Sequence, residues 1–158
     1  MKTIGIICIF IILSSCKKDE GKTANDPPSM NHALPQSTTA PIIGLEIGNL
    51  APDLYLKDTG NTFIQLSSIK NKLILIDFWA SWCGPCRFEN INLKNVYTKF
   101  KDTAFTSCKG FEIYSVSCDG NLGVWRNCIK TNNYSWKYNL IDSAEWNKTG
   151  SYLYNVTI

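Results

Sequence analysis

The chain has 158 residues, 44% of them hydrophobic and 18% charged, which suits one folded domain with a leader and a linker. Its net charge of +3, from 16 basic and 13 acidic residues, is too small to indicate nucleic-acid binding. The single histidine, His32, argues against a histidine-based metal site and against Ser-His-Asp catalysis, so the seven cysteines become the main candidates for chemistry.

The N-terminus has the pattern of an export leader. Lys2 is followed by an apolar run over 4–13, which suits the hydrophobic region of a signal peptide and is too short for a transmembrane helix. Leu13-Ser14-Ser15-Cys16 then resembles a bacterial lipobox. We therefore expect residues 1–16 to be a lipoprotein signal peptide with Cys16 as the lipidated residue. An ordinary signal peptide with an incidental cysteine is the alternative.

Residues 17–41 predict a flexible tether. The segment holds four of the six prolines, with Ser, Thr, Asn and Gly between them. It opens on the charged run Lys17-Lys18-Asp19-Glu20, which is either a surface-export signal or the solvated start of the tether. His32 lies in this segment, and we expect it to be inert.

The folded domain is predicted to span 42–158 and to begin with a hairpin. Short strands are expected at 54–57 and 62–66, joined by a turn at 58–61, and a short helical turn at 67–71 follows. The next run, 72–79, starts at Lys72 and is then apolar apart from Asp77, which predicts a strand buried on both faces.

Alternating helices and strands are expected after this buried strand. The spacing over 84–101 predicts a helix with Phe88, Ile91, Val96 and Phe100 on its apolar face. A strand at 111–117 and a second helix at 121–130 follow, and a short strand at 136–140 and a turn of helix at 142–146 come last. The apolar set of the second helix is Leu122, Val124, Trp125 and Ile129. This order predicts an α/β fold with a parallel βαβ unit and helices on both faces of the sheet.

Two cysteines lie between the buried strand and the first helix, in the sequence Cys83-Gly84-Pro85-Cys86. Cys83 would sit at the helix N-terminus, where unpaired N–H groups and the helix dipole lower a thiol pKa and favour the nucleophilic thiolate. Cys86 can close a disulfide with Cys83 and would be the buried thiol that resolves a mixed disulfide. Pro85 suits the first helical turn, and Trp82 would offer a flat apolar contact surface.

Two carboxylates complete this candidate site. Asp77 is costly inside an apolar strand unless it has a partner or a function, and a buried acid with a raised pKa could accept the proton of Cys86. Glu89, one helical turn after Cys86, could share the proton transfer, or it could be an ordinary solvated helix residue.

These residues carry a family resemblance. The segment 77–86, Asp-Phe-Trp-Ala-Ser-Trp-Cys-Gly-Pro-Cys, resembles the active site of the thioredoxin superfamily. The segments 48–53, 86–89 and 111–117, together with Asp119, are similar to the TlpA/ResA/DsbE-type oxidoreductases, which are membrane-tethered and extracytoplasmic.

The resemblance covers about residues 46–158, and it implies a thioredoxin-like fold with a central mixed sheet. It also implies that Cys83 attacks, that Cys86 resolves, that Asp77 is the buried acid and that Glu89 is the acid of the ResA-type branch. Trp82, Gly84 and Pro85 would then contact the substrate. One departure is Ile91, which stands where most relatives have proline.

A second departure concerns the end of the chain. In relatives, a segment like 154–158 is followed by a cis-proline, two antiparallel strands and a final helix, and the sequence stops before them. We therefore expect a fold without these C-terminal elements and with weak stability. The chain would be either a truncated reading frame or a short variant completed by a partner chain.

Three further cysteines, Cys108, Cys118 and Cys128, are spaced at intervals of ten residues, which matches no zinc pattern. Burial as small apolar residues is the default for Cys118 and Cys128, with a Cys108–Cys118 disulfide as the alternative. We expect no metal and no other cofactor.

The sequence thus predicts a lipid-anchored thiol-disulfide oxidoreductase of the bacterial cell envelope, periplasmic or surface-exposed. Its expected partners are disulfide-bearing or thiol proteins of the envelope, a membrane redox donor and the membrane itself, but no nucleic acid. A peroxiredoxin-like peroxidase is a rival, although Ala80 stands where such enzymes need Thr or Ser. A structural lipoprotein or an inactive truncated remnant is the other alternative.

Overall fold

The structure is a computed structural model that describes residues 11–14, 40–143 and 149–156. The predicted lipidation site Cys16, His32 and almost all of the predicted tether therefore lie outside the described residues. Within the described ranges, none of the helices is both long enough and apolar enough to cross a bilayer.

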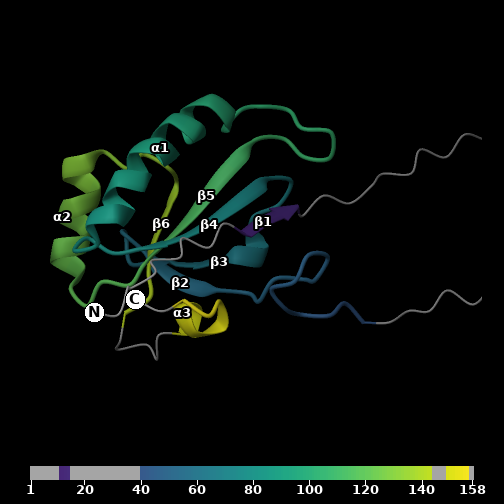
Figure 1. Cartoon of the computed structure of the whole chain (residues 1–158), viewed down its shortest axis with the longest axis horizontal. Helices are drawn as coiled ribbons and strands as arrows, with labels where there is room; N and C mark the ends of the chain where they lie inside the picture. The colour runs from purple at the N-terminus through teal and green to yellow at the C-terminus, as the bar shows by residue number, and fades with distance from the viewer. Residues whose placement is uncertain (1–10, 15–39, 144–148, 157–158) are drawn as a thin grey trace, which may run out of the picture.

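A six-stranded mixed sheet forms the centre of the described chain, in the order β1-β4-β5-β6-β2-β3 (Figure 1). The strands are β1 (Ile11–Ser14), β2 (Tyr55–Asp58), β3 (Phe63–Gln65), β4 (Leu73–Trp79), β5 (Phe111–Ser117) and β6 (Tyr138–Ile141). Strands β4, β5 and β6 run parallel, and β1 and β2 pair antiparallel with β4 and β6. The hairpin partner β3 is antiparallel to β2.

Helices cover both faces of this sheet. Helix α1 (Gly84–Phe100) joins β4 to β5, and α2 (Leu122–Asn132) joins β5 to β6, so two successive crossovers in one direction put both helices on the same face. Figure 1 shows α3 (Thr149–Leu153) on the opposite side of the sheet. The predicted α/β, thioredoxin-like arrangement is confirmed.

Strand β4 is buried on both faces because each face packs against its own core. Leu75 and Trp79 join the core under α1 and α2, together with Leu93 and Trp125 from the helices. Ile74, Ile76 and Phe78 of β4 join a second core with Tyr154, close to α3. This burial explains the unbroken apolar run in the sequence and leaves Asp77 as its one charged member.

The predicted apolar faces of the two helices were partly wrong. Phe88 and Ile91 of α1 are 69% and 56% exposed, and α1 instead buries Cys86, Asn90 and Leu93, which are spaced four and three residues apart. The rotation of α1 follows Cys86, whose side chain joins the core at the start of the helix. In α2, Leu122 and Val124 are likewise exposed, whereas Trp125 and Cys128 are buried.

The end of the described chain also differs from expectation. A turn of helix was predicted at 142–146, but residues 142–143 are not helical, and 144–146 lie outside the described residues. Helix α3 begins later, at Thr149. Asp142 accepts a hydrogen bond from the backbone N–H of Ser151 at 2.8 Å, so a side chain nine residues away satisfies an N–H group in the first turn of α3.

Strand β1 comes from the segment that the sequence analysis assigns to the leader. Its residues Ile11–Ser14 pair antiparallel with Leu73–Ile76 of β4 and occupy that edge of the sheet. The assignment of residues 1–16 as a signal peptide says nothing about their conformation in this structure, and that assignment stays a prediction. The structure adds that, in the chain as a whole, this segment is extended and paired.

Candidate active site

The two cysteines of the predicted motif lie where β4 turns into α1. After β4 ends at Trp79, the N–H of Cys83 donates to the carbonyl of Ala80 at 3.0 Å and closes a tight turn. Cys83 is the N-cap residue of α1, and its Sγ accepts a hydrogen bond from the N–H of Cys86 at 3.2 Å. A disulfide joins Cys83 to Cys86. The sequence arranges this locally, because proline at the first helical turn removes no helical hydrogen bond.

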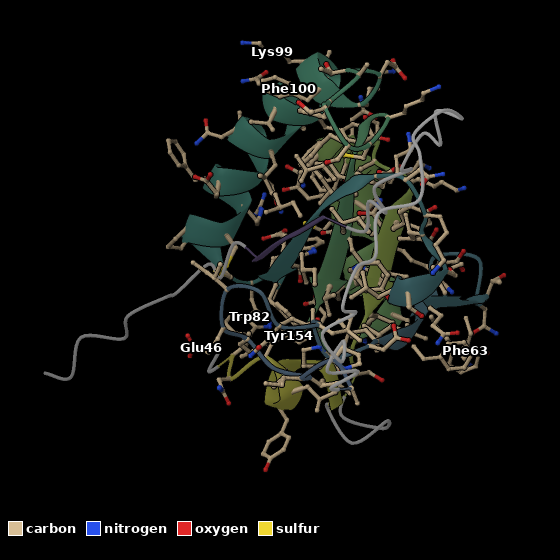
Figure 2. All side chains as sticks on the ribbon, turned by 90° about the vertical axis from the view of Figure 1, so that its right-hand side faces the viewer. Glu46, Phe63, Trp82, Lys99, Phe100 and Tyr154 are labelled. Carbon is tan, nitrogen blue, oxygen red and sulfur yellow. A yellow bond between two sulfur atoms is a disulfide. The ribbon has the colours of Figure 1, made fainter. Side chains whose placement is uncertain are left out.

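The surroundings of the disulfide are uneven. Cys83 and Cys86 are each only 5% exposed, so overall exposure does not separate the two thiols, and the predicted contrast in burial is not seen in the oxidised form. Trp82 beside them is 64% exposed, and Gly84 and Pro85 are exposed too. Figure 2 shows Trp82 near the start of α1, at the other end of the helix from Lys99 and Phe100. An apolar rim therefore surrounds a covered disulfide.

Asp77 stands between Leu75 and Trp79 in the same alternating set of residues along β4 and so lies on the face of the sheet that α1 and α2 cover. It is 4% exposed, and its burial raises its pKa to about 7. The hydroxyl of Ser115, on the neighbouring strand, approaches its Oδ2 at 3.4 Å and lowers the pKa, whereas the charge of Glu89 raises it. A carboxyl group that is half ionised near neutral pH is suited to general acid–base catalysis.

Glu89 is half-buried on α1, and its carboxylate accepts a hydrogen bond from the Nδ2 of Asn92 at 3.0 Å. Its electrostatic effect on Asp77 shows that the structure brings the two predicted acids into the same region. The catalytic roles of Asp77 and Glu89 stay predictions.

Asp119 was named above only as part of the family resemblance, and no role was predicted for it. It follows β5, is 3% exposed and accepts hydrogen bonds from the N–H and the hydroxyl of Ser81, two residues before Cys83. A third donor is the hydroxyl of Ser117. The sequence does offer one signal for Asp119, because it follows directly after a buried strand. Parallel strands end at the same edge of a sheet, so a residue after β5 is expected near the cysteines that follow β4.

Three further cysteines lie within the described residues, outside the Cys83–Cys86 disulfide. Cys108 and Cys128 are buried and Cys118 is half-buried, so the default expectation for Cys128 is met and the alternative Cys108–Cys118 disulfide is not formed. Burial raises the pKa of Cys128, and the nearby charge of Arg87 partly offsets this effect. Cys128 belongs to the same core cluster as Cys83 and Cys86.

Hollows in the surface of the described chain help to locate the site. One, of about 300 Å³, lies beside the dithiol turn and includes Ser81, Trp82, Arg87, Val124 and Cys128 in its lining. Another, of about 490 Å³, lies between β2, β6 and α2, and no residue of the 80–86 turn lines it. We assign the smaller hollow to the active-site region because Ser81 and Trp82, which precede Cys83, line it, although Cys83 and Cys86 themselves are not among its lining residues. The described residues hold no group of three or more His, Cys, Asp or Glu side chains placed to bind a metal ion.

Comparison with known proteins supports this assignment. The family model described as the AhpC/TSA family matches residues 47–145. The thiol-disulfide oxidoreductase ResA of Oceanobacillus iheyensis is 36% identical over 78 residues, which is 47% of this chain and 38% of the relative. ResA of Bacillus subtilis is 37% identical over 70 residues, or 44% of this chain and 36% of the relative. The chain thus spans less than half the length of these curated relatives.

Solved structures give the same result at the level of the fold. The thioredoxin domain of a Bacteroides vulgatus thiol-disulfide oxidoreductase superposes with a TM-score of 0.62 at 30% identity, covering 73% of this chain and 77% of that one. A Chlorobium tepidum structure described as a thiol:disulfide interchange protein DsbE gives a TM-score of 0.57 at 27% identity, covering 68% of each chain. The chain therefore belongs to the AhpC/TSA family, as a relative of the ResA- and DsbE-type thiol-disulfide oxidoreductases.

Proposed function

We propose that the chain is a thiol-disulfide oxidoreductase of the bacterial cell envelope that reduces or exchanges disulfides in other proteins. The observation that carries this proposal is the Cys83–Cys86 disulfide at the N-terminus of α1. In the reduced form, the N–H of Cys86 and the helix dipole would stabilise a thiolate on Cys83, which is the form that attacks disulfides.

The proposed reaction has two exchange steps. The Cys83 thiolate attacks one sulfur of a partner disulfide, so a mixed disulfide forms and the partner's other sulfur leaves as a thiolate. The Cys86 thiol then loses its proton and attacks the Cys83 sulfur, which restores the Cys83–Cys86 disulfide and releases the second partner thiolate. Two electrons pass from the dithiol to the partner, and a thiol donor at the membrane would return them.

Asp77 is the proposed acceptor of the Cys86 proton. Its pKa of about 7 lets it take up a proton and release it again near neutral pH. Glu89, whose charge acts on Asp77, would exchange this proton with solvent from its half-buried position. Trp82, Gly84 and Pro85 are the proposed contact surface for the partner's backbone around its disulfide.

The proposed location is the membrane surface of the envelope, through lipid on Cys16. The supporting features are the apolar run after Lys2 and the Leu-Ser-Ser-Cys sequence. Disulfide chemistry fits such an oxidising, extracytoplasmic compartment. The partners would be disulfide-bearing or thiol proteins of the envelope and a membrane redox donor.

A redox titration tests the activity. The full chain in mild detergent is equilibrated with glutathione buffers of graded potential, alkylated and weighed by mass spectrometry. We expect one two-thiol transition that is absent in Cys83→Ser and unchanged in Cys108→Ser. Reaction of Cys83 and Cys86 as independent thiols, without a shared midpoint, would refute the proposal. Consumption of hydrogen peroxide coupled to Cys83 would favour the peroxidase alternative.

Lipid labelling tests the location. Cells expressing the chain are fed a clickable palmitate analogue, and the protein is purified and examined for the label. We expect label on the wild-type chain and on Cys8→Ser, but none on Cys16→Ser. Equal labelling of Cys16→Ser would contradict the proposed anchor and leave the redox proposal standing.

A further inference from the structure

A buried carboxylate lies behind the turn that presents Cys83. Asp119 is 3% exposed and accepts three hydrogen bonds, from the Ser81 N–H at 2.9 Å, the Ser81 hydroxyl at 2.6 Å and the Ser117 hydroxyl at 2.7 Å. Both carboxylate oxygens take part. All three neighbours donate, so the ionised carboxylate, which only accepts, matches this set of partners.

These hydrogen bonds join two loops that are distant in sequence. Ser81 and Asp119 are separated by 38 positions. The backbone strengthens the connection, because the N–H of Cys118 donates to the carbonyl of Trp79 at 2.8 Å. The loop after β5 therefore holds the loop after β4 at its second residue, through both the main chain and the side chain of Ser81.

The position of Cys83 depends on this turn. Its N–H bonds to Ala80, immediately before Ser81, and its Sγ must face the N–H of Cys86 to receive the stabilisation that the helix end offers. A turn free to shift at Ser81 would move the sulfur away from the helix axis. Charge-assisted hydrogen bonds, about twice as strong as neutral ones, make Asp119 an effective anchor for this turn.

We propose that Asp119 and Ser81 form a latch that positions Cys83 and so sets the reactivity of its thiolate, with Asp119 acting as a positioning residue. The inference rests on the proposed role of Cys83 as the attacking thiol. The latch stabilises the geometry of the reduced site, in which the Cys83 thiolate accepts the Cys86 N–H.

The carboxylate could also act through its charge, with the opposite sign. A negative group near the dithiol disfavours a thiolate, whereas a held turn favours it. Ser81→Ala separates the two effects, because it removes one of the three hydrogen bonds and leaves the charge in place. Asp119→Asn removes the charge and keeps the shape. If positioning dominates, both substitutions slow Cys83. If charge dominates, Ser81→Ala leaves the rate unchanged and Asp119→Asn accelerates it.

The test uses the full chain, reduced and then alkylated with iodoacetamide near neutral pH. The rate at Cys83 is followed by peptide mass spectrometry, and the equilibrium with glutathione is measured in parallel. We expect Ser81→Ala and Asp119→Asn to lower the rate about fivefold and to shift the equilibrium toward the Cys83–Cys86 disulfide by a similar factor. Ser81→Thr keeps both donors and should restore the wild-type rate and equilibrium.

Asp53 provides a matched control. It also accepts hydrogen bonds from the N–H and the hydroxyl of one serine, Ser67, at 2.9 and 2.6 Å, and it lies in the loop before β2. Asp53→Asn should therefore leave the Cys83 rate and the glutathione equilibrium unchanged. Near-UV circular dichroism confirms that each variant is folded.

Two results would overturn the latch. One is an unchanged Cys83 rate in folded Ser81→Ala, and the other is a faster rate in Asp119→Asn. Another result would refute the proposed function and not the latch alone. If the Cys83→Ser variant still has the fast-reacting thiol of the wild-type chain, then Cys83 is not the nucleophile.

Discussion

Asp77 links the chemistry of the site to the stability of the fold. Its pKa is raised from 3.8 to about 7, mainly by burial, so the folded protein holds this proton more tightly than the unfolded chain does. Below about pH 4 the carboxyl is protonated in both the folded and the unfolded chain, so its ionisation does not lower the free energy of unfolding. As the pH rises from there to about 7, only the unfolded chain loses this proton readily, and the free energy of unfolding falls. A shift of this size corresponds to about 4 kcal/mol.

We predict that Asp77→Asn removes this pH dependence. The variant should match the wild type in urea unfolding near pH 4 and exceed it by a few kcal/mol near pH 8, because no buried charge has to form. Asp102→Asn is the control, since the Asp102 side chain is 87% exposed. Parallel pH profiles for Asp77→Asn and the wild type would mean that folding does not raise the Asp77 pKa.

Ser115 is predicted to tune the same carboxyl. Its hydroxyl lies 3.4 Å from the Asp77 carboxylate and favours the ionised form, so Ser115→Ala should move the Asp77 pKa above its value of about 7. Carbon-13 NMR of labelled aspartate side chains reports this pKa directly. Ser117→Ala is the matched control, because that hydroxyl bonds to Asp119 and not to Asp77. An unchanged Asp77 resonance in Ser115→Ala would remove Ser115 from the site.

For single residues, the sequence alone predicts a functional role when the neighbouring residues in the sequence already indicate it. Cys83 and Cys86 are recognised by their spacing, and Asp77 by being the one charge in an apolar run. The place of Asp119 just beyond a buried strand does not reveal its partner, because Ser81 lies 38 positions away and only the parallel pairing of β4 with β5 brings the two loops together. Residues that act through tertiary contacts need the fold to be known first.

At the scale of elements, α1 gives the sharpest contrast between sequence and structure. Phe88 and Leu93 are both large and apolar, but Phe88 is 69% exposed and Leu93 is 3% exposed. We predict that Leu93→Ala lowers the free energy of unfolding by about 2–5 kcal/mol, because it leaves a cavity under the helix. Phe88→Ala should change it by less than about 0.5 kcal/mol.

Chemical denaturation of the two variants checks this prediction. Equal losses would mean that the rotation of α1 about its axis differs from the one described. A second measurement separates folding from contact with partners: Phe88→Ala should leave stability intact even if it weakens disulfide exchange with a protein substrate, because Phe88 is exposed near the start of α1.

Element boundaries were predicted more closely than helix orientations. The strand expected at 111–117 is β5 as observed, and the helix expected at 84–101 ends one residue earlier. The orientation of α1 escaped prediction because Phe88, Ile91 and Leu93 are all apolar, and the packing of Cys86 decides which side is buried. The position of helix α3 was not predicted, because the side chain that hydrogen-bonds to its first turn, Asp142, lies nine residues before Ser151.

At the scale of the whole molecule, the order of strands and helices was sufficient to predict an α/β fold with helices on both faces. The strand β1 was not foreseen, because a candidate leader is set aside when a fold is derived from sequence. Its residues Ile11–Ser14 protect the edge of β4, which would otherwise present unpaired backbone groups.

We predict that a chain beginning at Lys17 loses this protection. Backbone amides of β4 that face β1 should exchange with deuterium faster than in the full chain, while amides in the β5–β6 pairing keep their rates. Hydrogen exchange with mass spectrometry compares the two chains. Identical exchange in β4 would show that β1 contributes nothing to the sheet.

The pairing of β1 with β4 has a consequence for the life of the protein in the cell. If residues 1–16 direct export, the translocation machinery must bind them while they are extended and accessible. A chain that folds early pairs Ile11–Ser14 with β4 at the edge of its own sheet, so part of the predicted export signal is no longer free to be bound. Export and folding then compete in time, and delivery requires that the chain be captured before its sheet closes. Cleavage before Cys16 would then remove β1. The edge strand on that side of the sheet would be β1 in the precursor and β4 in the cleaved protein.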